Sequence, residues 1–282
     1  GLPAVCLTGV GRSPAGTAAG EVGTTHTVAK NGDPEALINS AQVQDGDTIH
    51  IEETAGFRHE GDSPWVISKR VTIEGGNINI GAGGIVLGAD VTFKDVTLTF
   101  QMSARNAILA NGHVLTLENV KCGEFSFNLF CGGWIDSNHE GYPNPAPGTR
   151  GEIVIKGATS LQNRDTYGNG NIYAGNLCMG GTGQATSGVN GPANAFAGDA
   201  VIRIESGASS EKLGQIYACG AQQRNRDGQT SGKITLPDAV NYTVSGTVTI
   251  QGNVPHTVDG AGAAQTVVTF ESGNSLPSYQ MH

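Results

Sequence analysis

The side chains best suited to hold a ligand are aromatic and arginine residues in polar, glycine-rich stretches. Trp134 and Tyr142 lie in one stretch, and Arg150 is its last residue. Arg224 and Arg226 lie in another. A flat ring can stack on a sugar, or it can fasten a loop to the body of the protein. An arginine pair can grip a carboxylate or sulfate through paired hydrogen bonds, or it can belong to a solvated turn. We predict these five residues as ligand-binding.

Carboxylates in the polar stretches are the candidates for acid–base chemistry. Hydrolysis of a glycosidic bond needs two carboxyl groups, about 5–5.5 Å apart for retention and about 6.5–9.5 Å apart for inversion. The catalytic candidates are Asp136, Glu140, Asp165, Asp199 and Asp227. The basic groups that a lyase would need beside them are Arg150, Arg164, Arg224 and Arg226. The sequence contains no G-x-S-x-G, H-E-x-x-H or P-loop motif, so nothing favours another hydrolytic or phosphoryl-transfer chemistry.

Asp136, Asn138 and Glu140 alternate like the oxygen ligands of a calcium loop. The twelve-residue pattern of such loops is absent. These residues remain the candidate calcium site, and we predict no other cofactor or metal.

Composition narrows the class of protein. Of the 282 residues 43 are glycine, only 15% are charged, and the net charge is −9. Because the sequence contains no basic cluster, we predict no nucleic-acid partner. No apolar run approaches the length needed to span a bilayer, so we predict no membrane insertion. The low charge and many small polar residues favour an extracellular or cell-surface location.

A repeat organises the chain. Pairs of apolar residues separated by one residue recur along it: Ile49/Ile51, Val71/Ile73, Val91/Phe93, Leu115/Leu117, Ile153/Ile155, Ile202/Ile204 and Ile234/Leu236. Three polar insertions, at residues 134–150, 177–198 and 221–231, lengthen the later steps. Without them the period is roughly 22 residues, the length of a solenoid coil with three short strands.

The predicted fold is therefore all-β: a right-handed parallel β-helix with about 8–10 coils of roughly 22 residues. The second member of each apolar pair should stack into one interior column, consisting of Ile51, Ile73, Phe93, Leu117, Ile155, Ile204 and Leu236. The step from Ile234 to Val248 is too short for a coil, which leaves the register open there.

A short helix should cover the N-terminal end of the solenoid. Asp33 is suited to the N-cap position and Pro34 to the first helical position. We predict an N-terminal extension over residues 1–30 and a single β-helix domain over residues 31–282.

The five cysteines fit no metal-binding spacing. They are either small buried apolar residues or include one disulfide, for which Cys122 and Cys131 are candidates.

Four segments carry a resemblance to a known family: PEALINSAQVQDGDTIHI, VTIEGGNINI, IVLGADVTFKDVTLTF and AILANGHVLTLENVKC. They resemble pectate-lyase-like right-handed β-helix proteins, and more narrowly the β-helical regions of surface proteins of Gram-positive bacteria. The resemblance covers about residues 31–252. It implies the fold, but that superfamily includes lyases, hydrolases, adhesins and structural solenoids.

The insertions suggest where function lies. All three follow the same element of the coil, so they should emerge at one corner and stack into one surface, as binding loops of solenoids do. Tolerated surface decoration is the alternative, because long loops cost little. We expect a secreted or cell-surface module, on its own or within a larger protein, that binds a glycan or host surface protein or acts as a rigid spacer. The alternative is a carbohydrate-active enzyme, a polysaccharide lyase or glycoside hydrolase.

Overall fold

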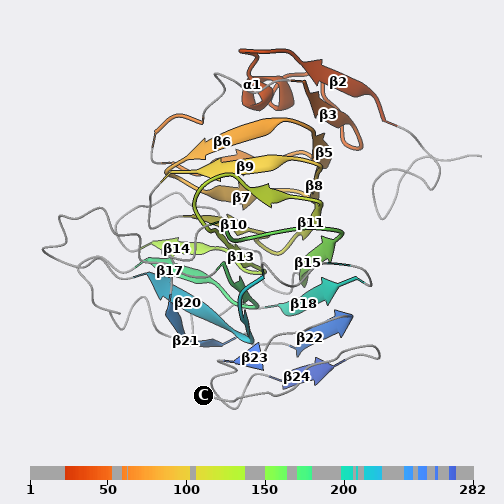
Figure 1. The fold of residues 1–282 in the computed structure, drawn as a ribbon. Coiled ribbons are helices and arrows are strands. Elements are labelled where there is room, and N and C mark those ends of the chain that lie inside the picture. The colour runs from red at the N-terminus through yellow and green to blue at the C-terminus, as the bar shows by residue number, and fades with distance from the viewer. Residues whose placement is uncertain are drawn as a thin grey trace, which may run out of the picture.

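Nearly all regular structure in the computed structural model is β-strand. It describes residues 23–52, 59–61, 63–101, 106–136, 150–163, 170–179, 198–205, 208, 213–223, 238–243, 247–252, 258–259 and 267–270. Within them the strands form four sheets, and successive strands are stacked from the N-terminal end to the C-terminal end (Figure 1). The only helix among these residues is α1 (Pro34–Ile38).

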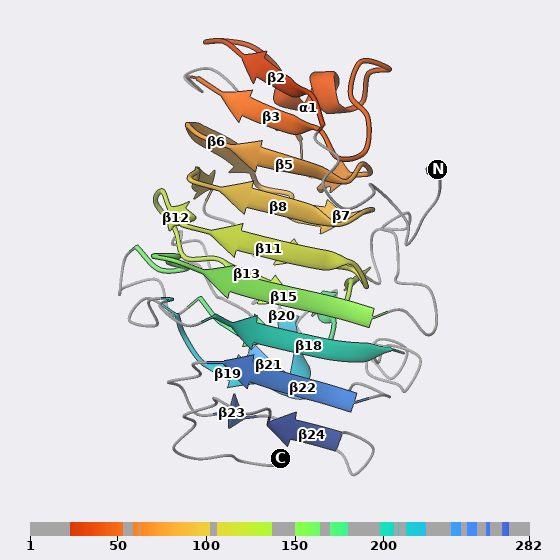
Figure 2. The ribbon, with the colours of Figure 1, turned by 90° about the vertical axis from the view of Figure 1, so that its right-hand side faces the viewer.

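The long sheet has nine parallel strands and forms one side of the molecule (Figure 2). Its strands are β2 (Thr25–Val28), β3 (Thr48–Ile51), β5 (Val71–Glu74), β8 (Val91–Lys94), β11 (Val114–Glu118), β15 (Arg150–Lys156), β18 (Asp199–Ile204), β22 (Thr247–Gly252) and β24 (Val267–Phe270). Because β2 pairs with β3, the sheet already begins inside the predicted N-terminal extension of residues 1–30.

Two further parallel sheets complete the stack. The second sheet consists of β4 (Trp65–Ile67), β7 (Ile85–Leu87), β10 (Ala107–Leu109), β13 (Asn128–Phe130), β16 (Ile172–Tyr173), β19 (Ile216–Tyr217) and β23 (Val258–Asp259). The short sheet consists of β6 (Asn77–Gly81), β9 (Thr97–Phe100) and β12 (Lys121–Cys122). The chain visits the second, long and short sheets in that order in β4–β5–β6 and repeats the order in β7–β8–β9 and β10–β11–β12. This repetition is compatible with a parallel β-helix.

The interior column is confirmed over its central part. Ile73 pairs with Phe93, Phe93 with Leu117, Leu117 with Ile155, and Ile155 with Ile204. All five side chains are buried. Alternation along each strand directs them inward, where they form one continuous core.

Both ends of the predicted column were wrong. Ile49, not Ile51, pairs with Ile73. A slip of two residues keeps the same side chains inward, so apolar alternation cannot distinguish the two registers. Leu236 lies outside the described residues, and β22 occupies the place beside β18, with Gly252 opposite Ile204.

Tight corners follow four strands of the long sheet. Gly75, Asp95, Asn119 and Gly157 each follow a long-sheet strand, with φ values of 78°, 53°, 53° and 60°. Glycine, asparagine and aspartate tolerate this left-handed conformation best. The Asn119 side chain donates to Asp95 Oδ1 at 3.2 Å and accepts from the backbone N–H of Ala158 at 2.8 Å. The Asn119 corner is thus tied to the coils on both sides.

An outward column of the long sheet alternates in charge. Glu74, Lys94, Glu118 and Lys156 are successive cross-strand partners. Lys156 Nζ lies 3.8 Å from Glu205 Oε1 in the next coil. Opposite charges on facing positions favour this register over a shifted one.

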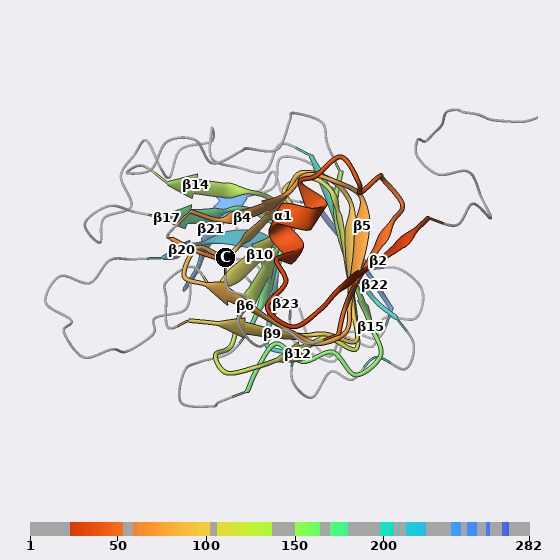
Figure 3. The ribbon, with the colours of Figure 1, turned by 90° about the horizontal axis from the view of Figure 1, so that it is seen from above.

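The predicted capping helix is confirmed. The Asp33 side chain accepts from the backbone N–H of Ala36 at 3.0 Å, and Pro34 begins the helix. Seen from above, α1 lies over the space between the sheets (Figure 3). Ile38 at its end is 1% exposed and joins the core. The helix therefore covers apolar side chains that the first coil would otherwise expose.

One carboxylate is buried near this cap, just before β3. Asp47 is 4% exposed and lies 2.8 Å, through Oδ2, from His26 Nε2. The same carboxylate accepts from the backbone N–H groups of Thr24 and Gln44. Burial alone would raise the pKa of Asp47, but these backbone and histidine hydrogen bonds together lower it below its usual value.

Candidate functional site

A fourth sheet, the side sheet, contains the first residues of the three insertions and one later strand. Its strands are β14 (Trp134–Asp136), β17 (Leu177–Met179), β20 (Cys219–Gln223) and β21 (Asp238–Thr243). Trp134 pairs with Leu177, and Leu177 with Ala221, in parallel register. The side sheet stands away from the long sheet when the molecule is viewed from above (Figure 3). Three successive insertions thus start side by side.

A glycine corner allows these strands to leave the solenoid together. Asn176, just before β17, accepts the backbone N–H of Gly133 through Oδ1 at 2.9 Å. A Cβ on Gly132 would lie 2.2 Å from that same oxygen, so no larger residue fits without displacing Asn176. The glycines before the first insertion therefore serve close packing between coils.

A second hydrophobic core lies between the side sheet and the outward face of the second sheet. Its members are Val86, Ala107, Leu109, Phe130, Trp134, Tyr173, Leu177 and Ala221. The rings of Phe130 and Tyr173 stack with centroids 4.6 Å apart, and those of Tyr173 and Tyr217 stack 5.0 Å apart. This aromatic ladder fixes the side sheet against the solenoid wall.

Burial decides between the two interpretations of Trp134. Its side chain is 1% exposed within the second core, so it packs the insertion against the wall and offers no ring face to a ligand. Arg150 lies on a different sheet, at the start of β15, where its guanidinium is 3.5 Å from Glu152 Oε1 and its side chain is 60% exposed. Tyr142, Arg224 and Arg226 lie outside the described residues.

Among the described residues, the predicted catalytic carboxylates do not form a cluster. Asp199 begins β18 on the long sheet, and its Oδ1 accepts the backbone N–H of Thr247 at 3.0 Å. This bond links two coils and gives Asp199 a structural role. Asp136 lies in β14, although its side chain is not described, and Glu140, Asp165 and Asp227 lie outside the described residues, as do Asn138 and Arg164.

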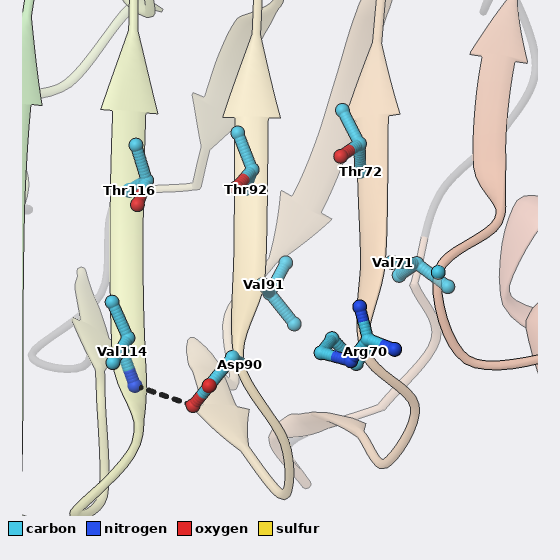
Figure 4. Close-up of a pocket in the computed structure, with 9 residues that line it drawn as sticks. Arg70, Val71, Thr72, Asp90, Val91, Thr92, Val114 and Thr116 are labelled. Carbon is cyan, nitrogen blue, oxygen red and sulfur yellow. Dashed lines mark hydrogen bonds between the residues drawn. The ribbon is translucent and has the colours of Figure 1, made fainter. Parts of the chain in front are cut away.

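The outward face of the long sheet contains a groove that sequence reasoning missed. Its cavity of about 260 Å³ is lined by Gly46, Arg70, Val71, Thr72, Asp90, Val91, Thr92, Val114 and Thr116. Thr72, Thr92 and Thr116 lie on three neighbouring strands, with Arg70, Asp90 and Val114 in a parallel row beside them (Figure 4). Each threonine is the middle residue of an apolar-x-apolar pair, so the repeat itself contained the signal.

The cysteines have no metal or disulfide role among the described residues. Cys122, Cys131 and Cys219 are buried free thiols, which removes the alternative of a Cys122–Cys131 disulfide. Burial raises the pKa of the Cys122 thiol to about 12, and it raises the pKa of Cys131 as well, with the nearby Glu152 carboxylate adding to the effect. Such thiols are unreactive packing residues.

Two further features are absent from the described ranges. In them, no three or more His, Cys, Asp or Glu side chains come together in a way that could hold a metal ion. No helix in them is long and apolar enough to cross a membrane.

Comparison of the chain with profiles of protein families, with curated proteins and with solved structures found no match.

Proposed function

We propose that this chain is an extracellular or cell-surface binding module whose three insertions form one recognition surface for a glycan or a host surface protein. The observation that supports this most is the register of the side sheet, in which Trp134, Leu177 and Ala221 are neighbours. Loops that start from adjacent parallel strands about 4.8 Å apart can contact one extended ligand. Decoration alone would not require a shared sheet.

The second core supports the same proposal. A recognition surface needs loops held by rigid elements, because order established before binding reduces the entropy that binding costs. Phe130, Tyr173 and Trp134 provide that rigidity with buried aromatic area. Under this proposal Trp134 positions the surface, while Tyr142, Arg224 and Arg226 remain the candidates for ligand contact.

We further propose that the stack of sheets is a right-handed parallel β-helix with coils of roughly 22 residues before insertions, as the family resemblance implies. Parallel strands joined by a crossover adopt the right-handed form in about 98% of cases, which supports that hand. Such a solenoid is stiff along its axis, so the module can also hold its recognition surface away from an attachment point.

Replacement of the insertions tests the function. Residues 137–149, 180–197 and 224–237 would be replaced one at a time by Gly-Ser linkers, which leave the side-sheet strands in place. A matched control replaces residues 164–169, which lie outside the three insertions. On a glycan array and a panel of host surface proteins, each insertion variant should lose about tenfold or more in affinity, and the control should bind as the parent does.

Two outcomes would contradict the proposal. If all three variants bind as the parent does, the insertions are decoration. If instead the parent converts a polysaccharide of the panel, and Asp136→Asn or Glu140→Gln abolishes turnover while binding persists, the chain is a carbohydrate-active enzyme.

A further inference from the structure

The groove on the long sheet has a floor of three threonines between two further columns of outward side chains. Thr72, Thr92 and Thr116 are successive cross-strand partners. Alternation places Arg70, Asp90 and Val114 outward on one side of them, and Glu74, Lys94 and Glu118 outward on the other. The threonines lie along a shallow cavity that crosses the strands (Figure 4).

The threonine hydroxyls are available to a ligand. Within the part of the chain that the structure describes, Thr72, Thr92 and Thr116 make no side-chain hydrogen bond. By contrast, Thr99 Oγ1 on the short sheet donates to Asn77 Oδ1 at 2.9 Å, and Thr159 Oγ1 donates to the carbonyl of Lys156 at 2.9 Å. Each free hydroxyl can both donate and accept a hydrogen bond.

Opposite charges lie in the row beside the threonines. The Asp90 carboxylate is held in place because its Oδ1 accepts the backbone N–H of Val114 at 2.8 Å. It also lies 3.9 Å from His113 Nδ1. Arg70 lines the same groove from the neighbouring coil. A ligand in the groove therefore meets a cation and an anion together, which disfavours ligands with a large net charge of either sign.

On its C-terminal side the groove ends where the threonine column ends, whereas on its N-terminal side the column continues to Thr48, which does not line the cavity. In the next coils the equivalent positions are Val154 and Arg203, in register with Thr116. Arg203 pairs with Glu152 and donates through Nε to Gln251 Oε1 at 2.6 Å, so long side chains fill the surface there. Three coils at about 4.8 Å spacing give a groove roughly 10 Å long.

We propose that this groove is a second ligand site, separate from the insertions, that binds one or two rings of a neutral glycan along the solenoid axis. Sugar hydroxyls donate and accept at closely spaced positions, which matches a row of threonine hydroxyls flanked by Asp90 and Arg70. The lining contains no aromatic ring, so binding rests on hydrogen bonds and is weak. The cavity of about 260 Å³ is smaller than the pockets that hold drug-sized ligands, which limits the ligand to a short segment.

Methyl NMR on the full chain tests the proposal. Threonine methyl resonances would be followed during titration with cellotriose, maltotriose and N,N′-diacetylchitobiose, and separately with a capped Gly-Ser tetrapeptide. At least one sugar should shift the methyls of Thr72, Thr92 and Thr116 at millimolar concentration and leave Thr99 unmoved. Thr92→Val keeps the branched shape and removes the hydroxyl, and it should raise Kd by about threefold or more. Thr99→Val is the matched control and should leave Kd unchanged.

The outcomes separate this site from the insertion surface. Variants with replaced insertions should bind the sugar at the groove as the parent does, whether or not they lose affinity for ligands on the glycan array. If no sugar shifts the three methyls at 20 mM, or if Thr92→Val and Thr99→Val behave alike, the groove is not a glycan site. If the peptide alone shifts them, the groove binds extended peptide and the proposal is wrong.

Discussion

The first coils and the later coils use the same interior contacts but very different lengths of chain. At one corner of the stack, an aspartate carboxylate accepts a backbone N–H from the next coil. This bond spans 25 residues at Asp45 and 24 at Asp90, but 48 at Asp199. The added residues leave the interior column unbroken, since Ile155 still pairs with Ile204. A solenoid therefore accepts insertions at one corner because its coils contact each other through the strands.

The later coils also contain a second hydrophobic core, which lies outside the first one. The first core is enclosed by three sheets, whereas the second lies between the second sheet and the side sheet. We expect the first to determine global stability and the second to determine the local order of the insertions.

The largest effect should come from the first core. Phe93→Ala removes a fully buried ring from the middle of the interior column and should cost about 3–5 kcal/mol of unfolding free energy. Denaturant melts would measure it. A loss under about 1 kcal/mol would mean that the ring is not interior.

Truncation of a side chain in the second core should cost less unfolding free energy, and its effect should be local. Trp134→Ala should cost about 3 kcal/mol or less, because the side sheet can loosen without opening the solenoid. Hydrogen exchange should accelerate in β14 and β17 and stay slow in β8 and β11. Equal acceleration in all four strands would show that the two cores unfold as one unit.

A corner substitution tests the tight turns that both regions share. Gly157 has φ +60°, and a Cβ there would lie 2.1 Å from Asn119 Oδ1. Gly157→Ala should therefore cost about 1–2 kcal/mol in denaturant melts. Ala158→Gly, one residue later, is the matched control for a change at the same corner. Equal losses would remove the special role of the corner.

Acid should weaken the contribution of Asp47 at the N-terminal end. The pKa of Asp47 is lowered in the folded state, so its contribution is present above the unfolded pKa and is lost as pH falls through the folded pKa. Melting temperature should therefore drop with acidification, and Asp47→Asn should reduce that dependence. An identical acid profile for the parent and Asp47→Asn would contradict the proposed role of this carboxylate.

The smallest effect concerns the outward charges. Lys94→Glu places three carboxylates in succession with Glu74 and Glu118 and should cost about 0.5–1 kcal/mol, mostly at low salt. Lys94→Gln should cost less. If salt makes no difference to the variant, the column does not help to set the register.

Apolar alternation predicted most of the core, because a buried parallel strand shows its inward residues directly. The register at Ile51 could not be predicted, because a shift of two residues leaves the apolar alternation unchanged. The position of Leu236 could not be predicted either, because an insertion of unknown length precedes the next strand. The capping helix was predictable from Asp33 and Pro34 because capping chemistry is local. The burial of Trp134 was not, since the side sheet that covers it forms only between distant coils.

The central claim is that the three insertions begin side by side, and cross-linking tests it directly. Cys178 pairs with Ile135 on one side and with Gln222 on the other. In-register neighbours about 4.8 Å apart fall within the Cα separation of a disulfide, about 4.4–6.8 Å. After mild oxidation, Ile135→Cys and Gln222→Cys should each link to Cys178, as peptide mapping by mass spectrometry would show, and Cys178→Ser should abolish both links. If the introduced cysteines stay reduced or link elsewhere, the insertions do not share a sheet and the account of the recognition surface fails.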